Sequence, residues 1–109
     1  MFNNRQNDRH STLARALIRG IDGEALLKDL SITGCCIEYT AHVDIKPEIE
    51  YSLEILPEKA SQIGNFELVV SSRWTKSSAY SYEIGFAIVS SPKGKLFQRY
   101  VDYITWRSS

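Results

Sequence analysis

Apolar and polar residues alternate along much of this chain, and the alternation predicts β-strands. From Ile49 to Ile55 every second residue is apolar, and glutamates and a serine occupy the positions between. Two later segments repeat this pattern. The residues expected to share one face in these segments are Phe66, Leu68, Val70, Ser72 and Trp74 in the first, and Tyr80, Tyr82, Ile84, Phe86 and Ile88 in the second.

Three shorter strands precede these segments and one helix follows them. Residues 13–19 and 24–30 read as strands joined by a glycine-containing turn, and a third strand is expected at about 35–40. After Ser91-Pro92, which suits a helix start, apolar residues recur every three or four positions as an amphipathic stripe. Six strands with short connections and a terminal helix predict a mainly β protein, a small antiparallel barrel whose open end the helix covers.

Size and composition indicate one globular domain. The chain has 109 residues, of which 43% are hydrophobic and 24% are charged. Its first residues form no apolar signal region, and about 18 consecutive apolar residues occur nowhere, so we expect a cytoplasmic protein without membrane insertion. The adjacent cysteines Cys35 and Cys36 are expected to be reduced.

Charge is unevenly distributed along the chain. The net charge is zero, but residues 1–19 contain four arginines and one aspartate. A duplex-binding protein needs a wide basic face to neutralise many phosphates, so we expect no DNA partner. A local basic patch of this kind suits a small anionic ligand.

Two short motifs carry the candidate chemistry. Arg5 and Arg9 form an Arg-x-x-x-Arg pair, whose guanidinium forks match phosphate oxygens and the O6/N7 edge of guanine. Asp29, Ser31 and Gly34 form an Asp-x-Ser-x-x-Gly turn, whose oxygens can accept the N1–H and N2–H protons of guanine. Taken alone, this turn is also explained by side chains that satisfy local backbone groups. Together the two motifs indicate a guanine nucleotide site.

In this order and at this spacing, the two motifs resemble those of the PilZ domain, a family that binds the bacterial second messenger cyclic di-GMP. The apolar residues 35–37, the strand at 66–74 and the segment Glu83-Ile-Gly-Phe86 are similar to later parts of that domain. The resemblance therefore covers nearly the whole chain. It implies a six-stranded antiparallel PilZ-type β-barrel with one C-terminal α-helix at 13–109, preceded by a flexible ligand-binding arm at 1–12.

The resemblance also implies a function and the residues that perform it. Arg5 and Arg9 would hold the phosphates and guanine edges of cyclic di-GMP, while Asp29, Ser31 and Gly34 would line the base. The chain would then be a stand-alone receptor or adaptor. Its arm would become ordered over the nucleotide and signal to an unidentified protein target, in a process such as motility.

A few further residues offer candidate chemistry. Arg73 and Trp74 are additional ligand-binding candidates, since an indole face can stack on a guanine, although core packing explains Trp74 equally well. The two histidines have no neighbours at metal-ligand spacing, and no nucleophile with a base or phosphate loop is present in the sequence. We therefore expect no metal, no cofactor and no catalytic activity.

Two other functions remain open at this stage. The chain could be a ligand-free PilZ-like module that acts through protein contacts. It could also be a small barrel that binds single-stranded RNA through its basic arm and aromatic residues such as Tyr80, Tyr82 and Trp74.

Overall fold

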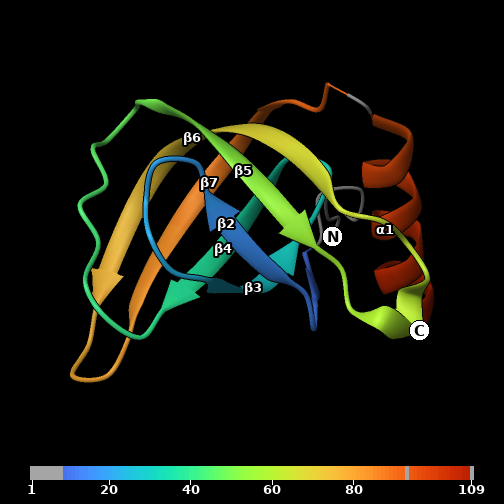
Figure 1. Cartoon of the computed structure of the whole chain (residues 1–109), viewed down its shortest axis with the longest axis horizontal. Helices are drawn as coiled ribbons and strands as arrows, with labels where there is room; N and C mark the ends of the chain where they lie inside the picture. Colours follow the sequence, from blue (N-terminus) through green and yellow to red (C-terminus); the bar gives the residue numbers. More distant parts are fainter. Residues whose placement is uncertain (1–8, 93, 109) are drawn as a thin grey trace, which may run out of the picture.

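Six antiparallel strands close into a barrel, and a C-terminal helix lies across one end of it (Figure 1). The computed structural model describes residues 9–92 and 94–108. The elements are β1 (His10–Ser11), β2 (Arg15–Ile18), β3 (Ala25–Leu30), β4 (Gly34–Tyr39), β5 (Glu50–Leu56), the 3₁₀ helix η2 (Lys59–Ser61), β6 (Phe66–Ser77), β7 (Tyr82–Ser90) and α1 (Gly94–Arg107). Strand pairing runs β2–β3–β4–β7–β6–β5 and returns to β2, which confirms the predicted fold class.

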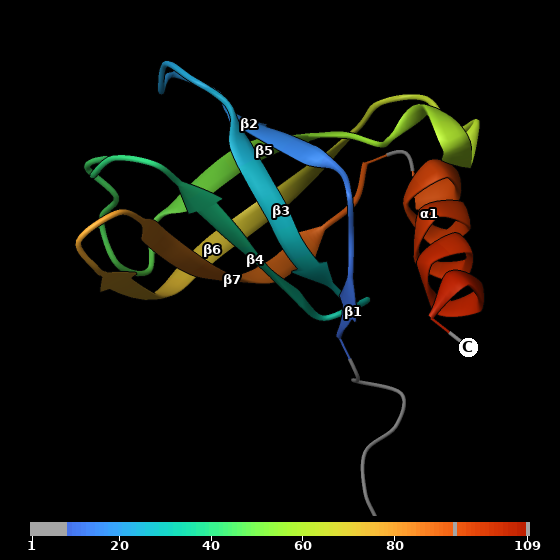
Figure 2. The same cartoon turned by 90° about the horizontal axis from the view of Figure 1, so that it is seen from below.

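The two-residue strand β1 extends the line of β2 along β3. His10 lies opposite Leu30 and Ser11 opposite Asp29, whereas β2 begins farther along β3, with Arg15 opposite Leu26. Figure 2 shows β1 at the end of β3, beside the C-terminal part of α1. Two polar residues carry no alternation, so the sequence did not predict this strand.

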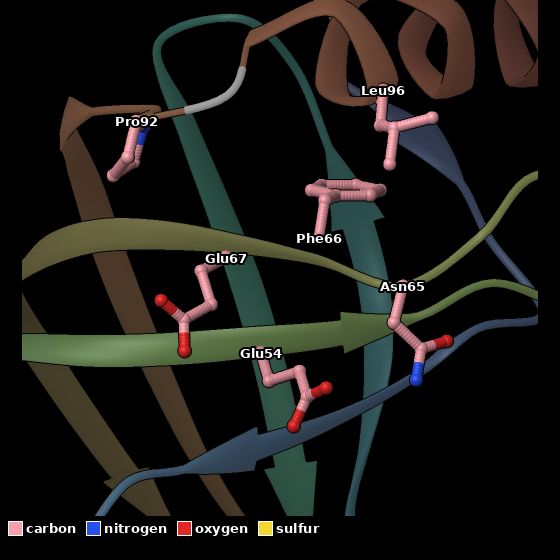
Figure 3. Close-up of a pocket in the computed structure, with 6 residues that line it drawn as sticks. All are labelled: Glu54, Asn65, Phe66, Glu67, Pro92 and Leu96. Atoms are coloured by element: carbon pink, nitrogen blue, oxygen red, sulfur yellow. The ribbon is translucent and has the colours of Figure 1, made fainter.

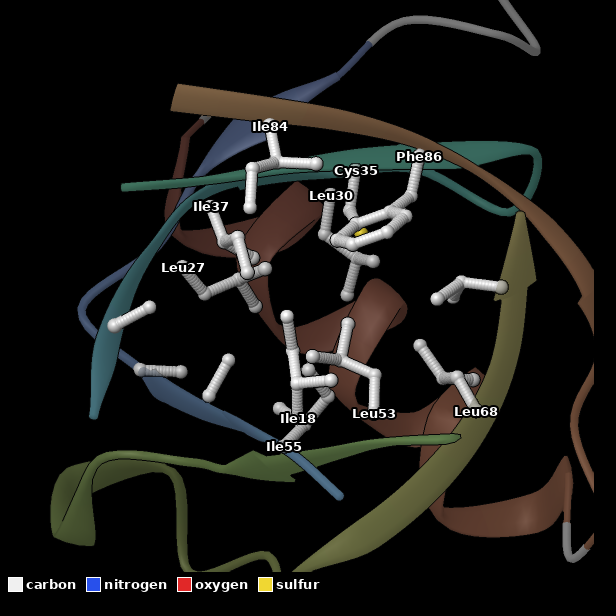
Figure 4. Close-up of a cluster of buried hydrophobic side chains, with 14 of the residues drawn as sticks. Ile18, Leu27, Leu30, Cys35, Ile37, Leu53, Ile55, Leu68, Ile84 and Phe86 are labelled. Atoms are coloured by element: carbon white, nitrogen blue, oxygen red, sulfur yellow. The ribbon is translucent and has the colours of Figure 1, made fainter. Parts of the chain in front are cut away.

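The barrel interior is filled by the inward side chains of all six strands. Figure 4 shows these side chains converging from the surrounding strands. The largest aliphatic residues that are fully buried are Ile104 of α1 and, in the strands, Ile18, Leu27, Leu30, Ile37, Leu53, Ile55, Leu68, Val70 and Ile84. Their burial is the main favourable term for folding, and it explains the alternation along the strands.

Helix α1 covers the barrel end through aromatic contacts. The Phe66 ring lies 6.0 Å from the ring centroids of both Phe97 and Tyr100. Tyr100 is fully buried, and its hydroxyl donates to Glu58 Oε1 at 2.6 Å in the loop after β5. In the part of the chain that the structure describes, no helix has both the length and the apolar character to cross a membrane.

Three expected face assignments are wrong. Ile49 precedes β5 and is exposed, and Tyr80 lies in the hairpin before β7 with 88% of its surface exposed. Trp74 was expected on the same face as Phe66, but the register of β6 with β7 shifts between Ser72 and Trp74. The extra residue in this β-bulge reverses the alternation, so Trp74 leaves the core side and is 42% exposed.

Candidate functional site

A β-bulge turns two consecutive residues of β3 toward the outside of the barrel. Leu27 lies opposite Ile37 and Asp29 opposite Cys36, so Lys28 is the extra residue on β3. Leu27 and Leu30 point into the core, and Lys28 and Asp29 between them are not buried. The bulge therefore presents the predicted acidic residue on the outer surface.

The turn after β3 is built around the Ser31 side chain. Ser31 N donates to Gly34 O at 2.9 Å, and Ser31 Oγ accepts from the backbone N–H groups of Thr33 and Gly34, each at 3.2 Å. Only 2% of the Ser31 surface is exposed. In the ligand-free structure this hydroxyl therefore shapes the turn and does not line an open surface.

Arg9 brings the two motifs together. Its Nη1 lies 3.6 Å from Asp29 Oδ1, and a Cβ built on Gly34 would stand only 2.7 Å from Arg9 Nη2 and 2.8 Å from Phe86 O. The missing side chain of Gly34 is what lets the guanidinium approach the backbone here. Arg9, Asp29 and Gly34 thus form a single surface, while Arg5 lies outside the described residues.

Asp29 offers an acceptor that the described part of the chain leaves unused. Its Oδ1 is buried and receives no hydrogen bond within the described residues, because 3.6 Å to Arg9 is too long for one. Burial raises the pKa of Asp29 above its usual value, and the charges of Arg9 and Lys28 and the backbone of Cys36 oppose this shift. A ligand that donates N–H groups would satisfy this oxygen.

One row of residues runs across the outer face of four strands. Trp74 lies opposite Gly85, Gly85 opposite Cys36, and Cys36 opposite Asp29. A Cβ on Gly85 would stand 2.1 Å from Trp74 Cε2, so the indole covers Gly85. Trp74 therefore lies on the same outer face as Asp29, with β7 and β4 between them.

A second ion pair, which the sequence patterns did not predict, borders this row. Lys28 Nζ lies 3.0 Å from Glu83 Oε2, while the Cys36 thiol approaches Glu83 Oε1 at 3.8 Å. The hydrogen bond from Lys28 lowers the pKa of Glu83. Only the register of β3, β4 and β7 brings these residues together, so no local sequence signal identifies them.

The other candidates are less closely connected to Arg9. Arg73 is the extra residue in the β6 bulge and lines a surface hollow with Ile45, Pro47 and Trp74. Neither Arg9 nor Asp29 lines that hollow. Arg73 and Trp74 thus line the same hollow, and Trp74 also belongs to the outer row that leads across β7 and β4 to Asp29.

A pocket of about 240 Å³ lies elsewhere, where β5 and β6 meet the start of α1 (Figure 3). The residues that line it are Glu54, Asn65, Phe66, Glu67, Pro92 and Leu96. Its charged side chains are two glutamates, and Glu67 is paired with Arg19. An acidic lining is unsuitable for a nucleotide phosphate, so this pocket is not the candidate site.

Comparison with known proteins identifies the fold. No family model matches the sequence, and no curated protein matches it. The structure is similar to that of the inhibitor of motility MotI/DgrA from Bacillus subtilis, with a TM-score of 0.80 and 16% sequence identity. The similarity covers 98% of this chain and 52% of that protein, so this chain spans about half its length. The chain therefore has the fold of the matched part of that protein, which is the six-stranded barrel with a C-terminal helix that the PilZ resemblance implies.

Proposed function

We propose that this chain is a receptor for cyclic di-GMP. One observation carries the proposal: the Arg9 guanidinium lies over Gly34 and beside a buried Asp29 oxygen that accepts no hydrogen bond from residues 9–92 or 94–108. A cation and an unused acceptor on one surface match the anionic phosphates and the N–H donors of a guanine nucleotide. The structural similarity to the inhibitor of motility supports the PilZ-type fold on which such a site would lie.

In the proposed complex each residue has a distinct task. Arg9, with Arg5, donates to the phosphates and to O6 and N7 of guanine, and Asp29 accepts from N1–H and N2–H. Gly34 leaves room for the base, and Ser31 holds the turn in shape. Trp74, in the same outer row as Asp29, provides an aromatic face for stacking. Arg73, beside Trp74 in the β6 bulge, is the further ligand-binding candidate, and it lines the same hollow as Trp74.

Ligand binding would become a signal through the arm. Residues 9–12 already contact the barrel, so ligand binding would act on the part of the arm before Arg9. Ordering that part over the nucleotide would change the surface offered to a protein target, and linkage requires that such a target strengthen ligand binding equally. Ordering the arm also reduces the net affinity, so we expect a dissociation constant on the order of micromolar. We propose that the target acts in bacterial motility or surface behaviour in the cytoplasm, and that the chain itself catalyses no reaction.

Isothermal titration calorimetry with cyclic di-GMP tests the proposal. We expect saturable binding that Arg9→Ala removes and that Arg19→Ala, a change of an exposed arginine paired with Glu67, leaves intact. Circular dichroism verifies that both variants fold. Absence of heat at high micromolar ligand would refute the receptor and leave a ligand-free interaction module.

Competition distinguishes the RNA-binding alternative. A single-stranded oligonucleotide should fail to displace cyclic di-GMP if the site is built for one dinucleotide. Binding of the oligonucleotide in place of cyclic di-GMP would favour the RNA-binding barrel.

Cyclic di-AMP is the matched control ligand for recognition of the base, because adenine lacks the N1–H and N2–H donors that Asp29 would accept.

A further inference from the structure

The Arg107 guanidinium links the end of helix α1 to β1, the strand that directly follows Arg9. Its Nη2 donates to the backbone carbonyl of Ser11 in β1, and its Nη1 donates to Glu58 Oε2 at 2.9 Å. Ser11 and Arg107 are 96 positions apart in the chain. Figure 2 shows β1 lying beside the last turn of α1.

Glu58 fixes the direction of this guanidinium. Its carboxylate accepts from the Tyr100 hydroxyl with one oxygen and from Arg107 with the other, and only 12% of its side chain is exposed. Burial, followed by the hydrogen bond to Glu58, raises the pKa of Tyr100, so the phenol stays a donor. Arg107 is therefore held on one side by Glu58 and extends its second nitrogen to β1. Lysine, with a single nitrogen, cannot make both contacts in the same way.

Strand β1 has few contacts of its own with which to hold Arg9. It pairs with β3 through two residues only, and Ser11 lies opposite Asp29 in that pairing. Arg9 comes directly before β1, and its ion pair with Asp29 is long and partly exposed. Such a pair contributes little to stability, so the position of Arg9 depends on how firmly β1 is held.

We propose that Arg107 is a positioning residue for Arg9, acting through the Ser11 carbonyl to hold β1, and with it Arg9, in place. The ligand in this inference rests on the proposed function, whereas the contact by which Arg107 holds β1 does not. When the binding-competent arm position is only partly populated, the apparent affinity falls by that fraction. Arg107→Met, which keeps the aliphatic stem and removes both donors, should weaken cyclic di-GMP binding roughly fivefold.

A double-mutant cycle distinguishes positioning from general destabilisation. Binding is measured by calorimetry for the wild type, Arg107→Met, Arg9→Lys and the double variant. In the Arg9→Lys background we expect Arg107→Met to leave the affinity unchanged, because lysine has no planar guanidinium whose orientation must be held. An equal weakening in both backgrounds would overturn the proposal. Arg99→Met is the matched control, since Arg99 is exposed on the same helix, and it should leave affinity unchanged.

Hydrogen exchange in ligand-free protein tests the structural step alone. The Thr12 amide donates to Lys28 O at 3.2 Å, and it should exchange several-fold faster in Arg107→Met than in Arg99→Met. Arg107→Lys should restore only part of the protection. Unchanged exchange at Thr12 would overturn the positioning role, whether or not cyclic di-GMP binds. If exchange at Thr12 is faster but the protein binds no cyclic di-GMP, the proposed receptor function is refuted, whereas the role of Arg107 in holding β1 against α1 stands.

Discussion

The guanidinium of Arg9 occupies the space that a side chain on Gly34 would fill. A Cβ at this glycine would stand 2.7 Å from Arg9 Nη2 and 3.4 Å from Arg9 Cζ. The first residue belongs to the arm and the second begins β4, so the contact joins the two motifs on the outside of the barrel. Glycine at position 34 is therefore a requirement of the site and of the strand beside it.

Gly34→Ala should destabilise the protein and remove the site together. The new methyl group would also lie 2.8 Å from Phe86 O, and this carbonyl belongs to the neighbouring strand β7 and cannot swing away. Overpacking of this kind lowers the free energy of unfolding by about 1–3 kcal/mol. Urea denaturation measures the loss. Gly64→Ala is the control, because its Cβ would meet nothing within 4 Å, and its stability should change by less than about 0.5 kcal/mol.

Asp29→Asn should make the ligand-free protein more stable at neutral pH. Burial raises the pKa of Asp29 in the folded state above its unfolded value, so the folded protein binds this proton more tightly than the unfolded chain. Stability due to this group therefore decreases as the pH rises from the ordinary aspartate pKa through the raised one. Asparagine resembles the neutral form and removes this cost. Between pH 4 and 7 the free energy of unfolding should depend less on pH in the variant than in the wild type. A variant that is less stable than the wild type at pH 7 would contradict the assignment.

The same carboxyl should make cyclic di-GMP binding depend on pH. Protonation of Asp29 replaces an acceptor by a donor, which opposes the N1–H and N2–H groups of guanine. As the pH is lowered, the affinity should begin to fall at a higher pH than it would if Asp29 had the usual aspartate pKa, because burial raises this pKa. Calorimetry at a series of pH values measures this. An affinity that is constant down to the ordinary aspartate pKa would exclude Asp29 as the guanine acceptor.

The alternation of apolar and polar residues predicted where the long strands lie. It did not predict to which side of the sheet the residues after a β-bulge point. Alternation located the long strands because inward positions such as Leu53 and Leu68 are buried. It failed at Trp74, because one extra residue in β6 reverses the side on which every later residue points. The sequence carries no sign of that extra residue, since a bulge is defined by the partner strand.

Motifs and the family resemblance predicted the meeting of Arg9 with Asp29 and Gly34, but not the contacts that only the folded barrel creates. The turn from Asp29 to Gly34 is a local motif, and its role follows from residue types. The pair of Lys28 with Glu83 spans 55 positions, and the contact of Arg107 with Ser11 spans 96. Such contacts depend on barrel closure and helix docking, which no local pattern encodes.

Neither cysteine should react in the folded protein. Cys35 points into the core, and burial raises its pKa to about 12. Burial also raises the pKa of Cys36 to about 11, and the neighbouring charges of Asp29 and Glu83 add to that shift. Thiolates are the reactive form, so iodoacetamide at pH 8 should label neither residue. Mass spectrometry should show no adduct in native buffer and two in denaturant. Rapid native labelling of Cys36 would mean that the outer row is open.

Gly85→Ala should displace the Trp74 indole from the outer row and weaken ligand stacking. The new methyl group would stand 2.1 Å from Cε2 and 2.2 Å from Nε1 of Trp74, so the ring must leave its place over β7. With Trp106→Phe as background, because Trp106 is already exposed, the emission of Trp74 should shift to longer wavelength. Loss of base stacking costs about 1–3 kcal/mol, so the affinity for cyclic di-GMP should fall roughly fivefold or more.

Trp74→Ala should weaken binding to the same extent, and Gly85→Ala should add nothing in that background. A Gly85→Ala variant with shifted emission and unchanged affinity would remove Trp74 from the binding surface and leave Arg9, Asp29 and Gly34 as its core.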